Sequence, residues 1–187
     1  MILIAIAITV APLPTTDLTP TIGFADARAC RLVPEGERII SRMRRAARDA
    51  GTGEALLNNQ ALRRLHPWMG MLIGGDLITR VVDTGTSGDT DRGTLIRLSP
   101  GSVLHGLPVT SIRFRFQQTA ESDGYTSREI VFAASPARVH AMMDRLGAKV
   151  PPMPGYLTMA DADDMEPGAI TIKGSGSTTT LTCGWGL

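Results

Sequence analysis

The chain has few aromatic side chains and no strong excess of charge of either sign. Eight of its 187 residues are Phe, Trp or Tyr, and the formal net charge is +1. Proteins that hold single-stranded nucleic acids stack bases on aromatic rings, and nucleic-acid binding in general requires a strongly basic surface. The composition therefore argues against a nucleic acid as the partner.

The N-terminal apolar run is too short to span a membrane. It covers Ile2 to Ala11, ten residues, whereas a transmembrane helix needs about 20. A run of this length is typical of the core of a signal peptide, and Ala25 to Ala27 supply a small-residue cleavage pattern. We therefore predict a leader over residues 1–27 and a single mature domain over residues 28–187. The alternative is that the isoleucine-rich run forms a buried N-terminal strand.

Cysteine is scarce as well. The two cysteines, Cys30 and Cys183, lie near the two ends of the predicted mature domain. In an exported chain such a pair favours a disulfide, and the alternative is two inert buried thiols. Neither cysteine belongs to a CxxC sequence, which argues against redox catalysis and a structural zinc site. The sequence thus predicts a Cys30–Cys183 disulfide and a periplasmic or secreted location.

The pattern of apolar residues predicts an α+β fold with helices packed on an antiparallel sheet of about six strands. The clearest strand is Val109 to Gln117, where Ile112 and Phe114 alternate with arginines, as in a half-buried strand. Strands are expected over residues 77–82, 94–98, 109–117, 125–133, 169–173 and 178–183. The last two flank a Gly/Ser segment and form a terminal hairpin.

Three helices complete the predicted fold. An N-terminal pair is expected over residues 36–51 and 53–65, because apolar residues recur there at helical spacing. A later helix begins at Ser135-Pro136, with serine as the cap and proline in the first position, and Gly147 ends it.

One segment carries a resemblance to an enzyme family. Val81 to Ser87, centred on Asp83-Thr84-Gly85, resembles the active-site loop of the aspartic proteases. In that family two such carboxylates share one proton and activate water. A single copy implies a dimeric enzyme with Asp83 as the catalytic carboxylate. The chain departs from the family pattern because the apolar pair and glycine, Leu72 to Gly74, lie upstream of Asp83. The alternative is a strand that ends in a polar turn.

Acidic loops and scattered histidines are the other candidate ligands. Three acids share one predicted loop: Asp83, Asp89 and Asp91. Four more fall within residues 161–166, and neither segment follows the order of ligands in an EF-hand. The histidines have no metal-type spacing: His66, His105 and His140. We predict no metal site and no cofactor.

The first predicted helix is rich in arginine. Arg38, Arg42 and Arg45 share one face at spacing i, i+4 and i+7, where like charges repel by about a few tenths of a kcal/mol per pair. We predict this face as a binding site for an anionic partner, such as an acidic protein, a lipid headgroup or a cell-wall polymer. The alternative is that the arginines pair with acids of the same chain, among them Glu35.

These features predict an exported, non-enzymatic interaction protein of the cell envelope, of the inhibitor or accessory-subunit type. Removal of residues 1–27 deletes Asp17 and Asp26 and no basic residue. The mature domain then has 19 basic and 16 acidic residues, a formal charge of +3. The competing prediction is a secreted hydrolase that uses Asp83.

Overall fold

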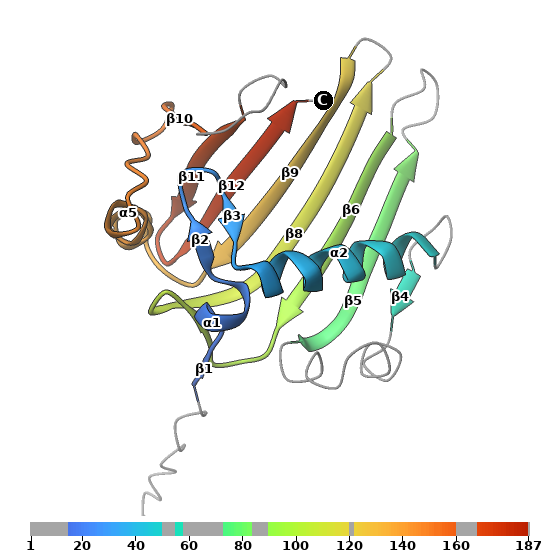
Figure 1. Ribbon diagram of the computed structural model, residues 1–187, viewed down its shortest axis with the longest axis horizontal. Coiled ribbons are helices and arrows are strands. Elements are labelled where there is room, and N and C mark those ends of the chain that lie inside the picture. The colour runs from blue at the N-terminus through green and yellow to red at the C-terminus, as the bar shows by residue number, and fades with distance from the viewer. Residues whose placement is uncertain are drawn as a thin grey trace, which may run out of the picture.

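A computed structural model gives the fold of the chain. It describes the backbone of residues 15–49, 55–57, 73–83, 90–119, 122–159 and 168–186. Side chains are described over residues 15–41, 95–115, 124–159 and 168–186. These parts form a curled sheet with helices against its concave face (Figure 1).

Eight strands follow one another across the sheet in the order β10-β11-β12-β9-β8-β6-β5-β4, and every neighbouring pair on this path is antiparallel. Their bounds are β4 Ala55–Leu57, β5 Ile73–Asp83, β6 Thr90–Leu98, β8 Leu107–Thr119, β9 Ser122–Phe132, β10 Leu157–Thr158, β11 Ala169–Ser175 and β12 Thr178–Gly186. Strand β7, Ser102–Leu104, pairs with the start of β8 and with β1, Thr16–Asp17. Strands β2, Phe24–Asp26, and β3, Arg31–Leu32, form a separate ribbon.

The described helices are α1, Thr19–Ile22, α2, Pro34–Asp49, and α5, Pro136–Arg145. The predicted N-terminal helix pair is wrong. Its first member is found as α2, but residues 55–57 of the second form strand β4, which pairs with β5. The leucines there fit helical spacing, yet the edge of β5 offers this segment a ladder of backbone hydrogen bonds, and tertiary pairing overrides a weak local pattern.

The predicted sheet of about six antiparallel strands is also wrong. The sheet has ten strands, and it is mixed because β1 runs parallel to β7. All six predicted strands exist, as β5, β6, β8, β9, β11 and β12. The additional strands are two or three residues long, which is too short for an alternating pattern to be visible in sequence.

Two local predictions are confirmed. In β8, Ile112 and Phe114 are buried while Arg113 between them is exposed. Helix α5 starts at Pro136 after Ser135, and Gly147 follows its end with φ +84°, a conformation that glycine adopts without steric strain.

The core lies between the concave face of the sheet and the elements that cover it. Helix α5 packs on β11 and β12 and buries Val139, Met142 and Met143. Residues 16–32, which we call the strap, also contribute side chains to this core. Six of its residues are buried in the core: Leu18, Ile22, Phe24, Ala27, Cys30 and Leu32.

Candidate functional site

Helix α2 lies across the concave face of the sheet and carries the predicted arginine face (Figure 1). Its inner side is fixed by Ile39 and Ile40, both buried in the core. Arg38, the residue before them, points outward with 68% of its side chain exposed. The helix thus separates an apolar inner side from a polar outer side, as expected for an amphipathic surface helix.

Arg38 forms an ion pair with Glu35, one turn earlier in α2, at 3.0 Å. Pairing with an acid of the same chain was the alternative to partner binding, and for Arg38 this pairing exists. Exposed pairs of this kind contribute about 0–1 kcal/mol, because water and salt screen both charges. The side chains of Arg42 and Arg45 lie outside the described residues, so the binding role of this face stays a prediction.

The N-terminal half of α2 is held to the sheet by a buried arginine, Arg128, in strand β9. Its Nη2 donates to Glu37 Oε2 at 2.9 Å, and its Nη1 donates to Glu37 Oε1 at 3.1 Å and to the carbonyl oxygen of Cys30 at 2.9 Å. Glu37 Oε1 also accepts the backbone N–H of Leu32 at 2.9 Å. Arg128, Glu37 and the Cys30 carbonyl therefore form one network, which we call the clamp.

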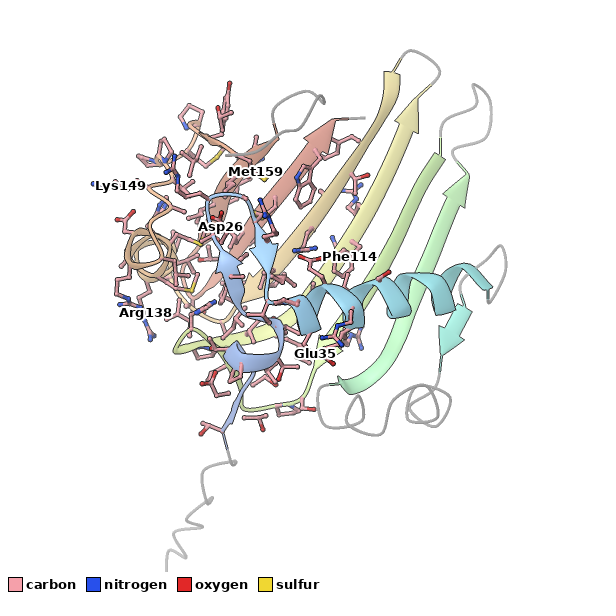
Figure 2. The ribbon with its side chains drawn as sticks, viewed as in Figure 1. Asp26, Glu35, Phe114, Arg138, Lys149 and Met159 are labelled. Carbon is pink, nitrogen blue, oxygen red and sulfur yellow. A yellow bond between two sulfur atoms is a disulfide. The ribbon has the colours of Figure 1, made fainter. Side chains whose placement is uncertain are left out.

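Aromatic rings enclose the guanidinium of the clamp. Its central carbon lies 5.7 Å from the ring centre of Phe114 and 5.9 Å from that of Trp185. Figure 2 shows Phe114 on the sheet close to α2. Arg128 Nε is buried, and among the described groups none accepts its hydrogen. Both terminal nitrogens bond to groups of the same chain, so the clamp joins β9 to α2 and to the strap.

The predicted disulfide is confirmed and lies beside the clamp. Cys30 and Cys183 are bonded, with their Cα atoms 6.2 Å apart. Cys183 is opposite Arg128 in the register of β12 and β9, and both cysteines are buried. The strap is therefore joined to the sheet covalently through Cys30 Sγ and by a hydrogen bond through its carbonyl oxygen.

The alternative catalytic residue, Asp83, is the last residue of β5 and pairs in register with Thr90 of β6. Its side chain and residues 84–89 lie outside the described part, so the aspartic-protease-like assignment stays a prediction. The test is Asp83→Asn, which should abolish a hydrolytic activity without unfolding the protein if that assignment holds.

The other candidate ligands do not form a common site where they are described. His105 lies in the turn between β7 and β8, His140 lies on α5, and the ring of each is hydrogen-bonded to a backbone group. His66, Asp89 and residues 161–166 lie outside the described residues. Where side chains are described, no group of three or more His, Cys, Asp or Glu residues could hold a metal ion.

Sequence reasoning missed the clamp, although its signal was present. In β9 the buried side chains Ile130 and Phe132 alternate with more exposed residues, and Arg128 falls in phase with the buried set. An arginine at an inward position of a strand needs a buried acceptor. Which acid supplies it depends on the fold, because Glu37 is 91 residues away in the chain.

Comparisons of the chain with family models, with curated proteins and with solved structures find no match. Among the helices described, none is long and apolar enough to cross a membrane. The functional argument therefore rests on the geometry of α2, the clamp and the disulfide.

Proposed function

We propose that this protein is an exported, non-enzymatic interaction protein of the cell envelope, which binds an anionic partner through the outer face of α2. The proposal is carried by the orientation of that helix. Ile39 and Ile40 face the core while Arg38 is exposed. Arg42 and Arg45 follow Arg38 at the spacing that helical periodicity assigns to one face.

The anchoring of α2 supports its use as a binding surface. The clamp fixes its N-terminal half through a carboxylate that accepts hydrogen bonds from Arg128 on the sheet and from the strap. A helix held in this way loses little conformational freedom when a partner binds, and such pre-organisation favours affinity. The Arg38–Glu35 pair is exposed and weak, so an anionic group can replace Glu35 at little cost.

The disulfide supports the exported location. Disulfides persist in secreted and periplasmic proteins and are rare in the reducing cytosol. Cys30 and Cys183 are both buried, so a reductant reaches the bond only when the structure opens. A disulfide-bonded chain without a membrane-spanning helix among its described residues is compatible with an extracellular location. The more specific location, in the periplasm or the cell envelope, is part of the proposal.

The test uses immobilised poly-L-glutamate as a defined anionic probe. We expect the parent protein to elute at higher salt than the variant Arg38→Gln/Arg42→Gln/Arg45→Gln, because bound counterions are released when these arginines meet the polymer. The matched control, Arg97→Gln/Arg113→Gln/Lys173→Gln, removes the same formal charge from exposed positions on strands β6, β8 and β11.

The two variants decide between a localised site and general charge attraction. A larger shift for the α2 variant, with thermal unfolding unchanged, supports the proposal. Equal shifts for both variants would contradict it, because the arginine face would then be only one part of a weakly basic surface.

A further inference from the structure

His105 occupies a tight turn against the strap. It lies between Leu104 of β7 and Leu107 of β8, which pair in register, and both turn residues have positive φ, +49° at His105 and +78° at Gly106. This is the pattern of a two-residue hairpin turn that fixes the direction of the first side chain. The His105 backbone N–H donates to Thr19 Oγ1 in α1 at 2.7 Å.

The His105 ring accepts a hydrogen bond from the strap. Its Nε2 receives the backbone N–H of Phe24 at 2.9 Å, and the imidazole is stacked on the Phe24 ring with centres 5.7 Å apart and planes at 7°. An imidazole nitrogen accepts a hydrogen bond only when it carries no proton. The closed strap therefore requires neutral His105 with its proton on Nδ1.

This contact secures a part of the strap that has few other hydrogen bonds to the sheet. Strand β1 pairs with β7 over two residues only. Leu18, Ile22 and Phe24 are buried in the core beside this contact. Opening of this segment would expose three large apolar side chains while the Cys30–Cys183 bond keeps the rest of the strap attached.

We propose that His105 is a pH-sensitive latch: protonation of Nε2 breaks the bond to the Phe24 amide and releases residues 16–24 from the β7–β8 turn. The protonated ring would present an N–H to the N–H of Phe24, so proton uptake destabilises the closed geometry. Residues 16–24 open locally, and α2 stays in place through the clamp and the disulfide.

Burial of the His105 ring, more than the charges near it, sets the direction in which its pKa shifts. Burial lowers the pKa of His105, and the carboxylate of Asp17 in β1 opposes this effect in part. The other described contacts are uncharged: Thr19 from α1, the Phe24 ring from β2, and Gly23, where an added Cβ would lie 3.1 Å from His105 Cε1. Because the pKa is lower in the closed state than its ordinary value near 6.5, the closed state is fully favoured above that pH. It loses stability as the pH falls toward the lowered pKa.

His140 is a natural control within the same chain. Its Nδ1 lies 3.1 Å from the carbonyl oxygen of Val150. A carbonyl oxygen only accepts, so Nδ1 must donate, and protonation of the ring leaves this bond intact. The two histidines therefore differ in one respect that matters here: Nε2 of His105 is an acceptor, and Nδ1 of His140 is a donor.

The test is amide hydrogen exchange of Phe24 between pH 7.5 and pH 5, expressed as protection factors that correct for intrinsic exchange. In the parent protein, Phe24 protection should fall by up to about tenfold per pH unit below about 6.5, as expected for uptake of one proton. The amide of Ile130 in central strand β9 should change much less. His105→Gln should remove the pH dependence of Phe24 protection, and His140→Gln should keep it.

Three results would overturn the proposal: constant Phe24 protection in the parent, an unchanged pH response in His105→Gln, or an equal fall for Ile130, which would indicate global unfolding. If His105→Gln does not fold, NMR titration of the parent protein tests the latch instead. The His105 ring and the Phe24 amide must then titrate with the same midpoint, and different midpoints would refute the latch.

Discussion

Each face of the curled sheet carries an ion pair between an arginine and a glutamate, and the two pairs differ in burial and in what they connect. Arg128 and Glu129 are neighbours in β9, and strand geometry sends them to opposite faces. On the covered face, Arg128 has 9% of its side chain exposed and binds both carboxylate oxygens of Glu37. On the opposite face, Glu129 meets Arg113 at 3.4 Å, and 47% of the Arg113 side chain is exposed. The covered pair joins two parts of the fold, whereas the other pair spans adjacent strands that are already hydrogen-bonded.

This difference shows that burial and connectivity, and not the type of residue, decide what an ion pair contributes. The covered face holds the core, and the strap, α2 and α5 all pack against it. Among the described side chains, the opposite face carries the Arg113–Glu129 pair and the exposed Tyr125, which lies over Gly184 so closely that a Cβ there would collide with it. Partial burial raises the pKa of Tyr125.

The largest expected loss of stability follows from removal of residues 16–27 of the strap. A chain that begins at Arg28 loses Leu18, Ile22 and Phe24 from the core, each worth about 1.5–3 kcal/mol when buried. Relative to a chain that begins at Thr15, we expect a loss on the order of 5 kcal/mol, comparable to the whole stability of many domains. Urea unfolding of the two chains measures the difference. Equal midpoints would show that residues 16–27 of the strap add nothing to the stability of the protein.

Substitutions in the clamp should give the next largest loss of stability, and removal of the Glu37 carboxylate should cost more than removal of the Arg128 guanidinium. Glu37→Ala leaves the buried Arg128 cation without a counter-charge, which typically costs about 3–5 kcal/mol. Arg128→Met leaves Glu37, whose side chain is 39% exposed, in contact with water, and we expect a loss of about 1–3 kcal/mol. Urea unfolding of both variants shows which of the two loses more stability. A larger loss for Arg128→Met would contradict this account of the clamp.

Loss of the disulfide should destabilise the covered face without altering the opposite one. The bond links residues 153 positions apart, and removal of a native disulfide typically costs about 2–5 kcal/mol, with loop closure setting an upper figure near 5 kcal/mol. Cys30→Ser/Cys183→Ser should therefore lower the midpoint of thermal unfolding. If the midpoint is unchanged, the clamp alone holds the strap in place.

The smallest effect is expected on the opposite face. Arg113→Met removes a partly exposed ion pair and should change the free energy of unfolding by less than about 1 kcal/mol. The change in free energy of unfolding of this variant, compared with that of Glu37→Ala under the same conditions, measures the difference between the two faces directly. Similar losses for the two variants would mean that burial does not distinguish the two pairs.

Long periodic segments could be predicted from the sequence, and short or long-range features could not. The alternation around Ile112 and Phe114 and the Ser135-Pro136 helix start are local, and both are found. Strand β4 and the β1–β7 pairing depend on partners that the local sequence does not reveal. The clamp depends in the same way on the pairing of Arg128 with Glu37 across the fold.

The candidate site was predictable only in part. Helical spacing alone was enough to predict the arginine face, and Arg38 is exposed as that spacing implies. The disulfide followed from cysteine count and inferred export. His105 carried no signal in sequence, because its role depends on a turn with positive φ and on a strap amide 81 residues away. The leader boundary after Ala27 stays a prediction, and it falls within the strap, where Leu18, Ile22 and Phe24 are buried in the core.

The central claim is an exported domain whose strap is joined to the sheet by one disulfide, and intact mass tests it most directly. The protein would be expressed from Met1 in a bacterial host and alkylated with and without prior reduction. We expect loss of the N-terminal leader, with two alkylation sites appearing only after reduction. Retention of Met1 with both thiols alkylated without reduction would contradict both the export and the disulfide.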